Sequence, residues 1–326
     1  MKTIWRGLVG IPLGLTVLWL LAEGSNLPTV EGFFPWRNLL VQYSGLLGMG
    51  VMSVAMVLAI RPAWLEPRLH GLDKMYRLHK WLGISGLILS VAHWLFSQGP
   101  KWLVQAGLLE KPARGPRPTQ TVEIFRFFQE QRSLAEQVGE IAFYAAVALI
   151  TIALIKRFPY RHFFTTHRWL AIVYLALVVH SVVLTSFPYW TQPLGIVMGI
   201  LMLAGTLAAL TSLFRRIGIK RKATGEILAA DYLAGVKVNA ITLQLQDRWP
   251  GHEPGQFAFV TFDEREGAHP FTISSAWAGD GRLQFLIKAV GDYTRTLAAT
   301  LKPGDPVTVE GPYGRFQFEG PARRQI

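Results

Sequence analysis

Cysteine is absent from this chain of 326 residues, and charged residues are scarce. Without cysteine there is no disulfide, no thiolate metal site, no iron–sulfur cluster and no cysteine nucleophile. Asp, Glu, Lys and Arg make up only 17% of the residues, whereas hydrophobic residues make up 51% and the mean hydropathy is +0.28. This composition excludes a disordered chain and argues against an ordinary soluble enzyme.

Acidic residues are in the minority, because 21 Asp and Glu stand against 33 Lys and Arg, for a net charge of +12. A basic excess indicates either a nucleic-acid partner or the basic loops of a membrane protein. No module that interleaves aromatic and basic residues is visible, so nucleic-acid binding is not expected.

Long apolar runs, in contrast, are abundant. Six stretches are each close to the roughly 20 residues that an α-helix needs to cross a bilayer. The first lacks an A-x-A-like cleavage site, which favours a retained helix over a signal peptide. We therefore expect a membrane all-α six-helix bundle within residues 1–222. The predicted spans are 7–22, 40–60, 80–97, 138–155, 168–187 and 193–214.

Most basic residues fall on alternate connections between these spans. By the positive-inside rule, both termini are expected in the cytoplasm. The opposite face carries Arg37 and the long connection 98–137, whose six basic residues are balanced by four Glu. This connection includes an amphipathic stretch, 122–128, which is a candidate for capping a site at the outer face or for lying on the membrane surface.

Four histidines lie in or beside the third and fifth spans, where ionisable residues are rare and usually functional. Both spans run from inside to outside, so equal depth pairs His79 with His167 and His93 with His180. The two levels are separated by roughly 20 Å, which suits two stacked porphyrins with two imidazoles each. We therefore predict two b-type haems, inner and outer. The alternative is four histidines that only form hydrogen bonds between helices.

The spacing within the fifth span does not suit an ideal helix. Thirteen residues separate His167 from His180, and such a spacing leaves the two side chains roughly 140° apart around the axis. A π-bulge, a tightened turn or a bend is therefore expected between them. Arg37, at the outer start of the second span, is a candidate contact to the outer haem or to an acceptor. The alternative is an arginine that is solvated or bound to lipid headgroups.

Beyond residue 222 the pattern changes to short β-rich segments with period two, which predicts a soluble antiparallel β-barrel over 223–320. In it, Phe271 is expected to stack on a flavin, Thr272 to hydrogen-bond near its reactive nitrogen, and Gly291 to let the backbone approach a pyrophosphate. The candidate FAD contacts are His269, Pro270, Phe271, Thr272, Ile273, Ser274, Lys288, Gly291, Tyr293 and Thr294.

The paired histidines, the His269–Thr272 motif and the following Val290–Thr294 motif resemble the ferric reductase and NADPH oxidase superfamily, in a bacterial form. The resemblance implies a ferredoxin reductase-type FAD-binding domain. It also implies electron transfer from cytoplasmic NAD(P)H through FAD and two haems to an external acceptor. Family members continue into a nicotinamide-binding domain, and residues 321–326 are expected to begin it. Either this sequence is a piece of a longer chain, which we favour, or that domain belongs to another chain.

Several functions stay open at this point. The acceptor is expected to be ferric iron or a ferric chelate, with molecular oxygen reduced to superoxide as the first alternative and a quinone or another oxidant as the next. From other classes, the histidines could serve a proton channel or transporter, or the chain could be a haem-binding sensor or assembly partner. No catalytic residue is assigned beyond the cofactor sites, no bare metal-ion site is expected, and the sequence does not indicate an oligomeric state.

Overall fold

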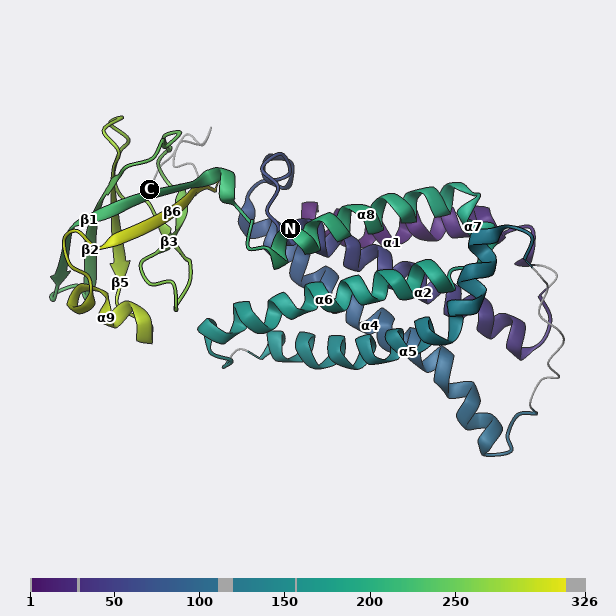
Figure 1. Ribbon diagram of the computed structural model, residues 1–326. Helices are drawn as coiled ribbons and strands as arrows, with labels where there is room; N and C mark the ends of the chain where they lie inside the picture. The colour runs from purple at the N-terminus through teal and green to yellow at the C-terminus, as the bar shows by residue number, and fades with distance from the viewer. Residues whose placement is uncertain (1, 28–29, 111–119, 156, 315–326) are drawn as a thin grey trace. The chain divides into compact units, whose positions relative to one another are not determined.

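The computed structural model describes residues 2–27, 30–110, 120–155 and 157–314 (Figure 1). The chain divides into two compact units that are not contiguous in sequence. The first comprises residues 1–62 and 74–215, and the second comprises residues 63–73 and 216–326. The predicted start of a nicotinamide-binding domain, 321–326, lies outside the described residues.

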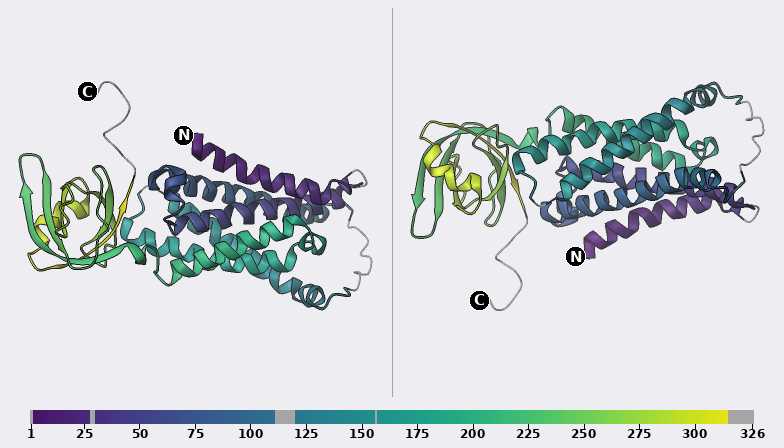
Figure 2. Two further views of the ribbon diagram at one scale, coloured as in Figure 1. Left: turned by 90° about the horizontal axis from the view of Figure 1, so that it is seen from above. Right: turned by 90° about the horizontal axis from the view of Figure 1, so that it is seen from below.

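The first unit is helical, and its long helices run alongside one another (Figures 1 and 2). Six of them are long and apolar enough to cross a membrane, which confirms the six predicted spans. The short α7 (Phe187–Trp190) lies between the last two of these helices. The six long helices are α1 (Lys2–Glu23), α2 (Phe33–Ala59), α4 (Leu72–Gln105), α5 (Glu123–Leu154), α6 (Tyr160–Leu184) and α8 (Pro193–Leu213).

The core of this unit is built by α2, α6 and α8. Small residues let these helices approach closely, as at Gly205 of α8, where a Cβ would overlap the Tyr174 hydroxyl. Tyr174 is 3% exposed and lies midway along α6, between the two histidine levels. Its hydroxyl is 2.8 Å from that of Ser53 on α2, which itself donates to the Met49 carbonyl. Tyr174 therefore joins α2, α6 and α8 and packs at the centre of this unit.

The connection 98–137 is more helical than the sequence suggested. Residues up to Gln105 continue α4 across Pro100, and α5 begins at Glu123 rather than near residue 138. The amphipathic stretch 122–128 thus forms the N-cap and first turns of α5. An ion pair of 2.9 Å between Arg132 and Glu136, one turn apart, supports this polar part of the helix. Residues 111–119 lie outside the described residues.

Helix α6 contains no π-helical turn, since its backbone is α-helical without interruption from Tyr160 to Leu184. The prediction of a π-bulge or tightened turn between the two histidines is therefore wrong. The physical reason is that the imidazoles need not lie on one face of α6. His180 hydrogen-bonds to α5, whereas His167 stacks on Phe163 of its own helix. Two haem planes at different depths can be approached from different directions.

The second unit is an antiparallel sheet in the order β4-β3-β6-β1-β2-β5. The sheet curls (Figure 2), and its edge strands meet at the single bridge between Ile273 and Phe285, so the predicted barrel is not closed by a continuous ladder. Inward residues alternate with outward ones and form one core, as period two predicts. The strands are β1 (Lys222–Leu233), β2 (Val238–Leu245), β3 (Phe257–Thr261), β4 (His269–Thr272), β5 (Arg282–Lys288) and β6 (Pro306–Tyr313), with α9 (Asp292–Thr300) and the 3₁₀ turn η2 (Ile219–Arg221).

Residues 63–73, which connect α2 to α4, belong to this second unit by their contacts. They contain the short helix α3 (Glu66–Leu69), whose Glu66 is 7% exposed. The Glu66 carboxylate accepts hydrogen bonds from the Gly314 backbone at 2.9 Å and from the Arg221 guanidinium at 3.2 Å. Arg221 also lies over the ring of Tyr313, with 4.8 Å between its Cζ and the ring centroid. This segment therefore forms part of the sheet unit although it lies between two membrane helices in sequence.

Candidate functional site

The four histidines form the two pairs that the sequence predicted. The ring centroids of His79 and His167 are 5.8 Å apart with the planes at 71°, and those of His93 and His180 are 6.2 Å apart at 85°. An imidazole nitrogen binds a first-row metal at about 2 Å, and the ring centroid lies about 1 Å further away. Two imidazoles on opposite sides of one iron therefore have centroids about 6 Å apart, which is the spacing of both pairs.

Three of the four imidazoles donate a hydrogen bond from Nδ1 to a backbone carbonyl. His79 donates to Ala55 at 2.8 Å, His93 to Val41 at 3.0 Å and His180 to Ala135 at 2.8 Å. A carbonyl can only accept, so Nδ1 carries the proton and Nε2 keeps its lone pair for a metal. The same hydrogen bond fixes the orientation of the ring, as is usual for metal-binding histidines.

His167 differs from the other three histidines. Its Nδ1 is buried and has no hydrogen-bond partner within the described part of the chain. The ring instead stacks on Phe163, one turn earlier on α6, with centroids 5.0 Å apart and planes at 13°. Packing therefore orients this imidazole, whereas hydrogen bonds orient the others.

Two glycines leave the space that the outer pair occupies. A Cβ on Gly139 of α5 would overlap the imidazole of His180, and a Cβ on Gly45 of α2 would lie 3.2 Å from Cε1 of His93. Neither glycine was predicted from the sequence to have a role here. The sequence feature that could have indicated them is a glycine inside an apolar span, because glycine lets a helix approach a bulky side chain closely.

The histidine pairs are suited to haem rather than to a bare ion. Among the described residues, no group of three or more His, Asp or Glu side chains could hold a metal ion. Each pair supplies two nitrogen ligands on opposite sides, and a porphyrin supplies the four that remain. The residues present therefore fit a haem at each level.

Arg37, the candidate contact at the outer face, is engaged by backbone. Its Nε donates to the Phe96 carbonyl at 3.0 Å, its Nη2 to the Ser97 carbonyl at 2.9 Å, and its Nη1 to the Asn38 side chain at 3.0 Å. Phe96 and Ser97 follow His93 by one turn of α4. Arg37 thus lies next to the outer histidine pair and binds the helix that carries it.

In the sheet unit, the predicted FAD residues gather around β4, the end of β5 and the start of α9. Alternation on β4 turns His269 and Phe271 toward the core side, and Pro270, Thr272 and Ser274 outward. Phe271 and Thr272 therefore face opposite sides of the strand. Ile273 is 5% exposed and lies in the core, while the Ser274 hydroxyl accepts a hydrogen bond from the Leu286 backbone. Lys288 is exposed at the end of β5.

An aromatic stack continues the core-facing side of β4. His269 stacks on Tyr293 of α9 at 4.7 Å between centroids, and on Phe271 at 6.1 Å. Burial lowers the pKa of His269, and the carboxylates of Glu266 and Asp292 partly offset this. His269 can offer a phosphate a hydrogen bond, and the exposed Lys288 can offer it a positive charge.

Gly291 is the N-cap of α9, and a Cβ there would meet only the Thr294 hydroxyl, at 3.6 Å. Its backbone N–H donates to that hydroxyl at 3.0 Å. The buried Asn239 of β2 holds α9 in place, because its amide donates to the Thr294 carbonyl and accepts from the Ala298 backbone. The Tyr293 N–H donates to the Asp292 carboxylate at 2.9 Å, so a phosphate at this helix N-terminus would have to displace these side-chain hydrogen bonds.

The Tyr293 hydroxyl is buried and has no hydrogen-bond partner among the described residues. Burial, aided by the carboxylates of Asp263 and Glu266, raises the pKa of Tyr293 to about 12, so the hydroxyl stays a neutral donor. An unpaired buried hydroxyl costs about 1–3 kcal/mol, which a ligand would recover by accepting its hydrogen bond. The surroundings of Tyr293 therefore fit a bound FAD.

Removal of this unpaired hydroxyl is expected to affect the flavin-free protein and the flavin-bound protein in opposite ways. Tyr293→Phe is expected to leave the flavin-free protein as stable as before, or up to about 1 kcal/mol more stable, and to weaken FAD binding about tenfold. Thermal unfolding of the whole protein with and without FAD, together with a fluorescence titration of FAD, measures both effects. Loss of stability in the flavin-free variant, or unchanged FAD affinity, would contradict the assignment.

Comparison with known proteins assigns a family description to each unit. Residues 44–178 match the family described as Ferric reductase like transmembrane component, and residues 232–317 match the family described as FAD-binding domain. No curated protein matches the chain.

Two solved structures show a limited likeness. The ferredoxin reductase in carbazole 1,9a-dioxygenase is 24% identical over 28% of this chain, with a TM-score of 0.26. This chain spans only 29% of the length of that reductase. A flavohemoglobin from Malassezia yamatoensis, with bound FAD and heme, is 13% identical over 92% of this chain and 64% of its own, with a TM-score of 0.31.

Proposed function

Because this chain carries the two domains that characterise the ferric reductase and NADPH oxidase superfamily, we propose that it moves electrons across a membrane, from FAD to an external acceptor. The observation that carries the proposal is the presence of two histidine pairs at different depths in one helical unit. In each pair the distance between ring centroids is that expected for two imidazoles bound to one iron. The same chain also has six apolar helices long enough to cross a membrane and an FAD-binding domain. It therefore combines the membrane spans and the flavin site that such a reaction needs.

The residues of the helical unit would hold two haems, the inner one between His79 and His167 and the outer one between His93 and His180. Bound there, haem supplies reversible one-electron chemistry. The carbonyls of Ala55, Val41 and Ala135 accept from Nδ1 and so leave three Nε2 atoms free to bind iron. Two histidines for each haem would leave the acceptor no open position on the iron, so these residues suit electron transfer to an acceptor that does not bind the metal.

In the sheet unit, β4 and the start of α9 would hold FAD, which accepts a hydride and releases single electrons. In this proposal Lys288, His269 and the backbone near Gly291 would contact its phosphates, and Thr272, on the outward side of β4, would contact its ring system. The electron donor in this proposal is NAD(P)H, bound by a further domain. The sheet unit and both termini lie in the cytoplasm of a bacterial-type cell, as the distribution of basic residues indicates.

For the acceptor, we propose ferric iron or a ferric chelate, with oxygen as the alternative. The described residues form no site for a bare ion, so a chelate that takes an electron at the outer face is the favoured form. A histidine-based proton channel or transporter is a second class of function. The flavin domain argues against it, because a proton relay has no use for FAD.

Stopped-flow reoxidation tests this proposal. Purified protein is reduced anaerobically with dithionite, freed of excess reductant, and mixed with ferric citrate or with air-saturated buffer while the haem absorbance is followed. Fast reoxidation by ferric citrate and slow reoxidation by oxygen would support a ferric reductase. Fast reoxidation by oxygen with release of superoxide would make the protein an oxidase. A purified protein without haem absorbance would overturn the proposal in favour of the channel or transporter.

A further inference from the structure

Pro100 lies inside α4, and its missing N–H leaves one carbonyl of that helix without a helical donor. In an α-helix the N–H of residue i donates to the carbonyl of residue i−4, so the carbonyl deprived by Pro100 is that of Phe96. An unpaired carbonyl in an apolar membrane costs several kcal/mol. Tolerance of Pro100 within a candidate membrane span therefore requires a donor from elsewhere.

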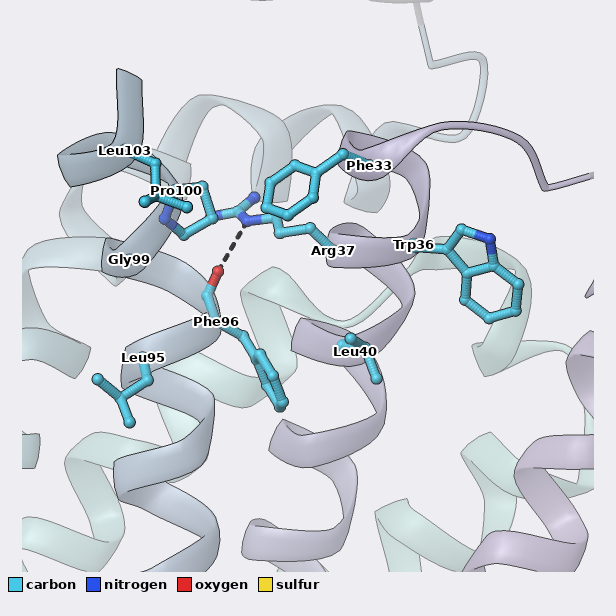
Figure 3. A pocket seen from close by; sticks show the side chains of 9 residues that line it. All are labelled: Phe33, Trp36, Arg37, Leu40, Leu95, Phe96, Gly99, Pro100 and Leu103. Atoms are coloured by element: carbon cyan, nitrogen blue, oxygen red, sulfur yellow. Dashed lines mark hydrogen bonds between the residues drawn. The ribbon is translucent and has the colours of Figure 1, made fainter. Parts of the chain in front are cut away.

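Arg37 of α2 supplies that donor (Figure 3). Its Nε donates to the Phe96 carbonyl at 3.0 Å, and its Nη2 donates to the next carbonyl, that of Ser97, at 2.9 Å. The guanidinium lies beside a cavity of about 310 Å³ that is otherwise lined by apolar side chains, Gly99 and Pro100. No carboxylate lines this cavity, although the charges of Glu136 and Arg132 on α5 also act on Arg37.

The same two helices are joined a second time one turn deeper. Val41, four residues after Arg37, accepts the hydrogen bond from Nδ1 of His93, which is three residues before Phe96. Ser44, a further turn along α2, lies 3.3 Å from the same Nδ1. Arg37 and His93 therefore form successive ties between α2 and α4, and the first tie sets where along α2 the imidazole finds its acceptor.

We propose that Arg37 is a positioning residue for the outer histidine pair. By pairing the Phe96 carbonyl that Pro100 exposes, and by donating also to the Ser97 carbonyl, it fixes the register of α2 against α4 and so the orientation of His93. Three of its five N–H groups donate these hydrogen bonds, two of them to the backbone of α4, and this commitment to α4 is what the positioning role rests on. The inference rests on the proposed function, because the pair it positions is the proposed outer haem site.

Arg37→Gln and Pro100→Ala, singly and combined, test this inference in the full-length protein. Haem content and the low-spin electron paramagnetic resonance signals of the two haems are recorded, with the inner signal as the control for folding. Arg37→Gln is expected to lower retention of the outer haem about tenfold and to shift its signal, as loss of a group that supports a metal ligand does. If Arg37→Gln abolishes both signals, Arg37→Lys, which keeps one donor and the charge, takes its place.

Pro100→Ala restores the missing N–H, so in that background the Arg37 substitution should change outer haem retention by no more than about twofold. Equal losses in both backgrounds would overturn the inference, since Arg37 would then act on something other than the Phe96 carbonyl that Pro100 exposes, such as a haem carboxylate. Absence of both haems from the unaltered protein would instead overturn the proposed function itself.

Discussion

His180→Leu is expected to leave the protein with one haem in place of two and to lower reduction of an external acceptor by more than about 100-fold. Leucine removes the Nε2 ligand and cannot replace the hydrogen bond to the Ala135 carbonyl. The inner pair does not share a residue with the outer one, so the inner haem and FAD should be retained. Pyridine haemochrome, flavin content and reduction of ferric citrate, all per chain, measure the three quantities.

His93→Leu should reproduce this result, because its imidazole is the opposite ligand of the same site. His162→Leu is the matched control, since His162 is an exposed histidine on the same helix as His180. Two haems in His180→Leu would show that His180 is not a ligand. Parallel loss of FAD would show global misfolding instead.

Gly139→Ala is expected to lower the outer haem content nearly as much as His180→Leu does, although it adds only one methyl group. The new Cβ would occupy the position of the His180 imidazole, and α5 and α6 pack too closely for the backbone to yield easily. His180 would have to leave its hydrogen bond with Ala135, which is on the same helix as Gly139. We expect outer haem content to fall at least about tenfold, with the inner haem kept.

Gly199→Ala is the control for this substitution. Gly199 is also a glycine within a membrane helix, but no atom lies within 4 Å of where its Cβ would be. It should retain both haems and the activity of the unaltered protein. If Gly139→Ala also retains them, the space at Gly139 is not needed for ligation, and the geometry of the outer pair would have to be revised.

The sequence predicted the parts of the helical unit that depend on composition and spacing. Apolar length defines the spans, and the equal depths of His79 with His167 and His93 with His180 follow from two helices of one direction. The carbonyl acceptors could not be predicted, because every residue has a carbonyl and only packing selects Val41 or Ala135. The continuous α6 was missed for a related reason. The angle between two side chains around a helix axis depends on that helix alone, whereas each imidazole of α6 is oriented by a different neighbouring residue.

In the sheet unit, period two predicted the strands and the inward core, but not the path of the sheet. Strand order and the single bridge between the edges depend on contacts between residues far apart in sequence. The start of α5 was placed too late because its first turns are polar and amphipathic, so hydropathy alone stops short of Glu123. The burial of Glu66 could not be predicted from the sequence, because an acidic residue in a short connection usually faces solvent.

The contribution of residues 63–73 to the second unit bears on how this protein can be taken apart. The chain passes between the units three times, after Pro62, Asp73 and Arg215, so the flavin-binding part is not a cassette joined at one hinge. A fragment cut at residue 216 would leave the Gly314 backbone and Arg221 without the Glu66 carboxylate. A chimera that exchanges this part with a relative's must exchange the α2–α4 connection with it, and the two pieces then have to evolve as one.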